Sequence, residues 1–202
     1  MRIAATTRCV NFYHFYDNIS GVSRMTRTTL SGQKIAIMVS NGFDEKNFVE
    51  IQKMLMTQNA GLKVVSANSG LVNGRNGDQA GISYPVDSLL SDTLAIDYDA
   101  LVIPSGRLHT ASLKDELHAI RIIRAFLREG MPVLVQDDAL DVICEINDEI
   151  DGNALRAGAP LASLENIIWA SLDANMSEVS RAFVASCLRS TDAKVEDGSA
   201  AA

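Results

Sequence analysis

The sequence has little cysteine, and the cysteines it has are poorly placed for a covalent or metal-bound framework. They are Cys9, Cys144 and Cys187. Their number is odd, and no two of them show the short spacing of a zinc or redox site. We therefore expect neither a disulfide network nor a bound metal. Reduced thiols are the expected state, which is typical of the cytoplasm.

Long apolar runs and an excess of positive charge are also missing. No run of about 18 apolar residues is present, so we expect no membrane-spanning segment. The stretch after Arg8 is rich in aromatics but is not continuously apolar, which argues against a secretory signal. The formal net charge of −7 disfavours nucleic acid and anionic membranes as main partners, because both are negatively charged. Together these absences predict a cytoplasmic protein.

Both ends of the chain lack a periodic apolar face. Residues 1–31 contain an aromatic cluster at 12–16, and we interpret them as an extension, with Met25 as an alternative start. A second interpretation stays open, in which the aromatics form an arm that packs on a partner subunit. Residues 191–202 are small and polar, and we expect a mobile tail there. The remaining residues, 32–190, are enough for one domain with a substantial core.

Strands and helices alternate along this domain. Short apolar runs rich in β-branched residues predict buried strands at 34–40, 62–67, 99–104, 132–136 and 166–171. Apolar residues at helical spacing predict helices at 44–60, 113–129, 137–146 and 176–189. The alternation predicts an α/β fold of the flavodoxin-like, doubly wound kind, with a mainly parallel sheet and helices on both faces.

Two segments do not follow this alternation. Residues 68–96 are rich in turn signals such as Asn73-Gly74 and Asn76-Gly77, which predict a small β-excursion. Residues 147–165 contain glycine and proline and are predicted to be a loop. In the helix at 113–129, one apolar stripe is expected from Leu117, Ile120, Ile123, Phe126 and Leu127.

Ligands of open parallel sheets bind at the carboxyl ends of the strands. Three strand ends are therefore the candidate places for chemistry. Each carries polar or glycine residues: Asn41-Gly42-Phe43-Asp44, Pro104-Ser105-Gly106-Arg107 and Gln136-Asp137-Asp138-Ala139. The last turns directly into a predicted helix, an elbow that exposes one side chain beside backbone N–H groups.

In combination, the segments KIAIMVSNGFDEKNF, DYDALVIPSGR and GMPVLVQDDALDVI resemble the ThiJ/PfpI superfamily, which has a class I glutamine-amidotransferase-like, flavodoxin-like fold. The resemblance covers about residues 34–146. The family's pattern is a strand ending in Gly-Phe-Glu with a further Glu, a second strand ending in Pro-Gly-Gly, and an elbow of Cys-His-Gly. Within this family, the C-terminal domain of large-subunit catalases is similar and also lacks the elbow cysteine. It has an Asp-Ala in the elbow, where this chain has Asp138-Ala139.

The departures from the family pattern fall on its reactive residues. Asp137 stands at the cysteine position, Asp138 at the histidine position and Asn47 at the position of the second glutamate. Ser105 replaces a glycine, while Gly106 remains. The thiolate nucleophile is therefore absent, and a carboxylate in its place attacks only activated substrates.

Several residues keep two interpretations. In one interpretation, Asp137 and Asp138 form an acid/base pair or a weak magnesium site. In the other, one of the two caps the following helix and the other is a solvated carboxylate. His109 is either a base borrowed from a loop or a solvated loop residue. Arg107 either clamps an anionic ligand or pairs with Asp44 or Asp137. The isolated thiols of Cys144 and Cys187 are expected to be buried and inert.

Our hypothesis from the sequence is a non-catalytic module that binds a small ligand or a partner, or stabilises an assembly. The expected ligand residues are Gly42, Asp44, Ser105, Gly106, Arg107 and Asp137, with no cofactor and no metal. The resemblance implies a homodimer. The alternative is a divergent hydrolase- or lyase-like enzyme whose candidate catalytic residues are Asp137, Asp138, Asn47 and His109. A flavin or nucleotide binder rests on fold analogy alone.

Overall fold

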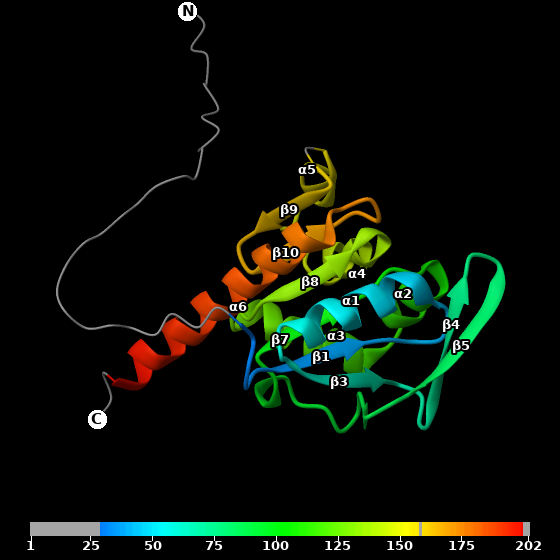
Figure 1. The fold of residues 1–202 in the computed structure, drawn as a ribbon, viewed down its shortest axis with the longest axis horizontal. Coiled ribbons are helices and arrows are strands. Elements are labelled where there is room, and N and C mark those ends of the chain that lie inside the picture. The colour runs from blue at the N-terminus through cyan, green and yellow to red at the C-terminus, as the bar shows by residue number, and fades with distance from the viewer. Residues whose placement is uncertain (1–28, 158, 200–202) are drawn as a thin grey trace, which may run out of the picture.

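The computed structural model describes residues 29–157 and 159–199. The predictions made for residues 1–28 lie outside that part. Within it, a seven-stranded sheet has the order β6-β3-β1-β7-β8-β10-β9. Neighbouring strands from β6 to β10 are parallel, and β9 at the other edge is antiparallel. The expected mainly parallel, doubly wound sheet is confirmed (Figure 1).

Five of the seven strands lie where the apolar runs predicted them, whereas β6 lies in the turn-rich segment 68–96 and β9 in the predicted loop 147–165. Their bounds are β1 Lys34–Met38, β3 Gly61–Ser66, β6 Ser88–Leu89, β7 Ala100–Ile103, β8 Val133–Gln136, β9 Leu161–Leu164 and β10 Ile167–Ala170. Strands β7, β8 and β10 are buried along their whole length, and only the first residue of β1 is exposed. Such burial on both faces explains why these strands are continuously apolar. Strand β7 lies between β1 and β8, so the strands that carry the candidate residues are neighbours.

Helices cover both faces of the sheet (Figure 1). Helices α1 (Glu45–Thr57) and α6 (Met176–Ser199) pack on one face around Phe48 and Phe183. The other face is covered around Phe126 by α2 (Arg107–Lys114), α3 (Leu117–Arg128), α4 (Leu140–Ile146) and α5 (Gly152–Arg156). Two short 3₁₀ segments, η1 (Ala95–Asp97) and η2 (Asp137–Ala139), precede β7 and α4.

The turn-rich segment forms the predicted β-excursion. Strands β4 (Leu71–Asn76) and β5 (Gln79–Pro85) make a hairpin that turns at Gly77, which has a positive φ of 62°. The two-residue strand β2 (Phe43–Asp44) joins β4 in a second, three-stranded sheet. The hairpin therefore stands beside the end of β1, at one end of the candidate site (Figure 1).

Four expectations about helices and loops were wrong. The segment 113–129 is not one helix, because α2 ends at Lys114 and α3 begins at Leu117, where the Glu116 side chain accepts a hydrogen bond from the His118 N–H. Its buried face is Ala119, Ile122, Ile123 and Phe126, whereas Leu117 is 76% exposed. The segment 147–165 contains α5 and β9, and α6 continues to Ser199.

Among the described residues, no helix combines the length and the apolarity needed to cross a membrane.

Candidate functional site

The turn from β8 into η2 and α4 forms the elbow that the sequence predicted. Asp137 stands at its apex with a φ of 42°, a left-handed conformation that crowds the Cβ atom of an ordinary residue. Aspartate tolerates this conformation better than most residues do. The Trp169 Nε1–H donates a hydrogen bond to the Asp137 carbonyl at 3.2 Å and fixes the turn to β10. The strained geometry of a nucleophile elbow is therefore present without a cysteine.

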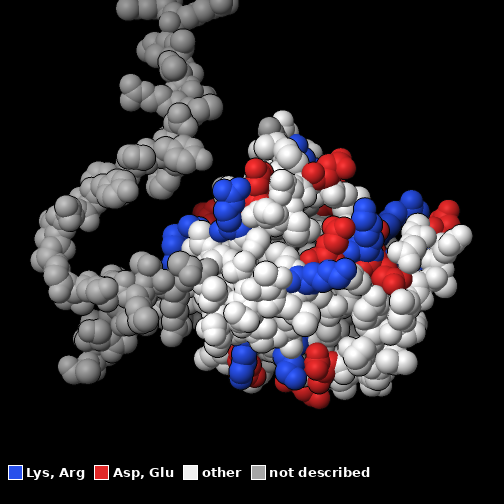
Figure 2. Space-filling view, viewed as in Figure 1, with Lys and Arg blue, Asp and Glu red and all other residues white. Residues whose placement is uncertain are grey.

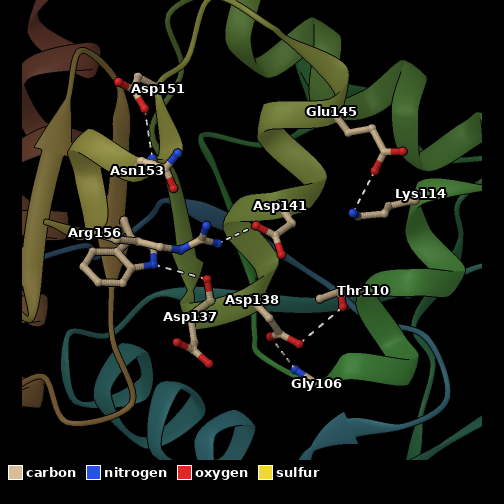
Figure 3. A network of polar contacts seen from close by, with 11 residues as sticks. Gly106, Thr110, Lys114, Asp137, Asp138, Asp141, Glu145, Asp151, Asn153 and Arg156 are labelled. Atoms are coloured by element: carbon tan, nitrogen blue, oxygen red, sulfur yellow. Dashed lines mark hydrogen bonds and ion pairs between the residues drawn. The ribbon is translucent and has the colours of Figure 1, made fainter.

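The carboxylate of Asp138 joins the elbow to the end of β7. It accepts hydrogen bonds from the Gly106 N–H at 2.9 Å and from the Thr110 hydroxyl at 3.3 Å. Partial burial raises the pKa of Asp138, and the nearby Asp137 charge adds to the rise, while the Gly106 hydrogen bond opposes it. Figure 3 shows the two carboxylates pointing in different directions, with Asp138 alone directed at Gly106. No hydrogen bond joins the two carboxylates in the described part of the chain.

The prediction that an elbow carboxylate caps the following helix was wrong. The residues at the cap positions of η2 and α4 are Gln136 and Ala139, and neither makes a side-chain cap hydrogen bond. Asp138 is turned away toward Gly106, a partner 32 residues earlier in the chain. At α1 the corresponding prediction is confirmed, because the Asp44 carboxylate accepts from the Asn47 N–H at 2.9 Å.

The ends of β1 and β7 meet at Gly106. Its φ is 143°, and a Cβ atom there would lie 2.6 Å from the Phe43 Cα and 2.8 Å from the Asp44 nitrogen, so only glycine fits. The Asp44 N–H donates to the Ser105 carbonyl at 2.8 Å. The Asn47 amide donates to the Ser105 hydroxyl at 2.9 Å. Both Asn47 and Ser105 are buried, and each holds the other in place.

His109 is a fully buried structural residue. It lies in α2, where its Nδ1 accepts from the Ser40 N–H at 2.9 Å and its Nε2 lies 3.1 Å from the Pro104 carbonyl oxygen. Burial lowers the pKa of His109 to about 3, against the smaller effect of the Pro104 contact. The ring is neutral near pH 7, and both of its nitrogens are engaged. The expectation of a solvated loop histidine was wrong.

Four of the predicted ligand residues line one hollow of about 400 Å³. They are Gly42, Asp44, Gly106 and Arg107. Arg75 and Asp78 of the β4–β5 hairpin lie on the same hollow, so it has charges of both signs. Arg107 is exposed, and among the described residues it pairs with neither Asp44 nor Asp137.

Two buried polar residues, Glu45 and Gln136, were not among the predicted site residues. Glu45 is only 8% exposed, and its carboxylate accepts from the Asn76 amide at 2.8 Å, the Ile82 N–H at 3.0 Å and the Tyr84 hydroxyl at 3.2 Å. Burial, with the neighbouring Glu45 charge second, raises the pKa of Tyr84. Gln136 is 2% exposed, and its Oε1 has no hydrogen-bond partner among the described residues. Glu45 lies in the first turn of α1 and Gln136 at the end of β8, and neither position indicates from the sequence that the side chain is buried.

Cys144 and Cys187, the cysteines that the structure describes, take no part in this site. Cys187 is buried as predicted, and burial raises its pKa to about 12. Cys144 is only partly buried, and burial again is the largest cause of its raised pKa. Within the residues that the structure describes, no group of three or more histidine, cysteine or acidic side chains is arranged to hold a metal ion.

Comparison with known proteins points to one family. A model described as the DJ-1/PfpI family matches residues 33–135, about half of the chain. Among curated proteins, catalase HPII of Pseudomonas putida is 31% identical over 101 residues, which cover 50% of this chain and 13% of that protein. General stress protein 18 of Bacillus subtilis is 27% identical over 103 residues, covering 50% of this chain and 58% of that protein. The chain thus spans less than two thirds of the length of either relative.

Solved structures of the same fold are also similar. A ThiJ/PfpI domain protein from Brachyspira murdochii has a TM-score of 0.63 at 16% identity, covering 81% of this chain and 98% of that one. A two-domain protein of Anabaena variabilis with DJ-1/ThiJ/PfpI-like and ferritin-like domains has a TM-score of 0.65 at 17% identity. The match covers 76% of this chain and 47% of that one. At these identities the likeness concerns the fold alone.

Proposed function

The chain belongs to the DJ-1/PfpI family, and we propose that it is a non-catalytic member that binds a small ligand or a partner at the elbow cleft. One observation carries the proposal: the Asp138 carboxylate holds the Gly106 N–H at 2.9 Å. A backbone N–H at a strand end beside an elbow is the kind of donor that stabilises developing negative charge on a substrate. In this protein that donor is already bound to the chain's own carboxylate.

The other departures support the same conclusion. The thiolate position is Asp137, and the second acidic position is Asn47, whose amide is used by Ser105. His109 has both ring nitrogens engaged and is neutral. No activated nucleophile or available base therefore faces Asp137 among the candidate residues.

Binding is supported by the hollow beside the elbow. Its basic residues are Arg75 and Arg107, and its acidic residues are Asp44 and Asp78. Such a mixture suits a small polar ligand that carries both donors and acceptors. The proposal includes the homodimer that the resemblance implied and the cytoplasmic location expected from reduced thiols. The similarity to catalases of much greater length suggests a free-standing counterpart of an accessory domain, without peroxide chemistry.

A second candidate is a divergent hydrolase- or lyase-like enzyme. Its support is the raised pKa of Asp138 beside the strained backbone of Asp137, because perturbed and strained groups gather at active sites. In this alternative, Asp138 donates a proton and Asp137 acts as base or nucleophile on an activated substrate.

The test is a turnover screen of the full chain on aldehyde, ester, peptide and amide substrates, beside Asp137→Ala and Asp138→Ala. The non-catalytic proposal expects background rates from all three proteins. Turnover by the wild type that Asp137→Ala abolishes overturns the proposal and supports the enzyme.

A variant in which the family's residues are restored tests whether the elbow cleft is open. Asp137→Cys with Asp138→His and Asn47→Glu returns the family's residues and removes the carboxylate that occupies Gly106. We expect its thiol to react faster with iodoacetamide than Cys144 of the wild type does. Equal rates would mean that the cleft itself is closed.

A further inference from the structure

A hollow of about 770 Å³ lies between η1 and α3, beside the starts of β7 and β8, whereas the elbow follows the end of β8. It is on the face of the sheet opposite to α1, because Ala95 and Met131 on its lining pack with the core under α3. One wall is the aliphatic segment 94–96, and the other is helix α3. The volume is within the range of about 300–1,000 Å³ that holds small organic molecules.

Three arginines of α3 line this hollow: Arg121, Arg124 and Arg128. Spacings of three and four residues place them in one row along the helix. The chain as a whole is acidic, with a net charge of −7. On the opposite face, which Figure 2 shows, acidic and basic side chains are intermingled over α1 and beside the hairpin. The arginine row is thus a local concentration of positive charge.

The arginines are held differently. The Nη2 of Arg121 donates to the carbonyls of Leu90 at 3.1 Å and Thr93 at 2.8 Å, which ties α3 to the residues just before segment 94–96. Arg128 pairs with Glu129 at 2.8 Å, but both side chains are mostly exposed, so a ligand displaces this pair at little cost. Arg124 is exposed, and it pairs with no carboxylate in the described part of the chain. The groove therefore presents two exposed guanidinium groups, those of Arg124 and Arg128, to an incoming anion.

The aliphatic wall is unusually open to water. Ile96 is 86% exposed and Leu94 is 50% exposed, two residues apart in the same short segment. Contiguous exposed apolar surface is a feature of binding sites, and Leu94 and Ile96 both line the hollow. Here they face the arginine row across the hollow.

We propose that this groove binds a small carboxylate with an apolar body. The body lies along Leu94 and Ile96, and the carboxylate accepts charge-assisted hydrogen bonds from Arg124 and Arg128. The site is separate from the elbow hollow, with which it shares no lining residue. It therefore goes beyond the function proposed above and does not depend on it.

The test uses three probes on the ¹⁵N-labelled full chain at pH 7: octanoate, octan-1-ol and acetate. Backbone amide shifts of residues 94–96 and 121–131 report binding. We expect octanoate to shift these amides in a saturable way. Octan-1-ol lacks the charge and acetate lacks the apolar body, so each should bind at least about tenfold more weakly.

Two variants test the two halves of the site. Arg124→Gln removes the free guanidinium, and Ile96→Ser removes the exposed aliphatic side chain. Each should weaken octanoate binding about tenfold, the effect of losing one charge-assisted hydrogen bond or a buried aliphatic contact. Arg181→Gln is the matched control, since Arg181 is 78% exposed on α6 and outside the groove.

Three results would overturn the proposal. If octan-1-ol bound as tightly as octanoate, the arginines would not contribute to recognition of the carboxylate. An equal loss in Arg181→Gln would mean that only general surface charge acts. If octanoate leaves these amides unchanged while Ile96→Ser dissociates a dimer in sedimentation, the groove is an interface between copies.

Discussion

Asp137 has a φ of 42°, a conformation that glycine adopts without strain and that alanine resists. Its side chain makes no helix cap. Its contribution to stability is therefore mainly a matter of backbone conformation.

We predict that Asp137→Gly is more stable than Asp137→Ala by about 1 kcal/mol in urea unfolding. Asp141 supplies the control, because it lies in the first turn of α4. There the order should reverse, with Asp141→Ala more stable than Asp141→Gly by about 0.5–1 kcal/mol. If the alanine variant were the more stable one at both positions, the backbone strain at Asp137 would not affect the free energy of unfolding.

Asp138 gives stability a particular dependence on pH. Its pKa in the fold is raised above the ordinary 3.8. As the pH rises, the unfolded chain loses this proton first, so the folded wild type loses stability until its own raised pKa is passed. The free energy of unfolding of the wild type, measured relative to Asp138→Asn, should therefore fall between pH 3.8 and the raised pKa. Above that pKa, the difference in unfolding free energy between the two proteins should be constant.

The measurement is urea unfolding of both proteins from pH 3 to pH 7. Asp138→Leu separates charge from hydrogen bonding, because it leaves the Gly106 N–H unpaired and should cost about 1–3 kcal/mol at every pH. Thr110→Val removes only the longer of the two contacts, at 3.3 Å, and should cost less than Asp138→Leu. A wild type that gains stability over Asp138→Asn with rising pH would contradict the raised pKa.

At the scale of elements, the β4–β5 hairpin is attached to the start of α1 through Glu45. Three donors of the hairpin, from Asn76, Ile82 and Tyr84, converge on its carboxylate. Gly81 makes room for it, since a Cβ atom there would collide with Glu45 Oε2. The hairpin supplies Arg75 and Asp78 to the elbow hollow, so this attachment shapes the site.

We predict that Glu45→Ala lowers the free energy of unfolding by about 2–4 kcal/mol, because about three hydrogen bonds are lost and their donors stay partly buried. Hydrogen exchange of the Ile82 amide should accelerate more than exchange in the central strand β8. Glu50→Ala, a half-buried position on the same helix, is the control and should change both readouts little. Uniform acceleration throughout the chain would mean that Glu45 acts on global stability alone.

At the scale of the whole molecule, the proposed homodimer is open to direct measurement. Large aliphatic side chains such as Leu71 and Ile82 are more than half exposed, and apolar surface of this kind favours self-association. Sedimentation equilibrium at tens of micromolar should give twice the chain mass of 21.8 kDa. A mass equal to one chain would refute the prediction.

The sequence by itself determined the central sheet and the identity of the residues at the elbow. Strands β1, β7, β8 and β10 are buried on both sides, so each of them contains a run of consecutive apolar residues that the sequence shows directly. The residues at the elbow can be read directly, whatever their surroundings.

Only the tertiary structure decided where the polar groups point. Asp138 bonds to Gly106 across 32 residues, and His109 bonds to Ser40 across 69. Helix start signals favoured a local cap for the aspartate and a solvated loop for the histidine, because local rules carry no information on distant partners. The parallel sheet brings these strand ends together, and their burial then requires that each polar atom find a partner.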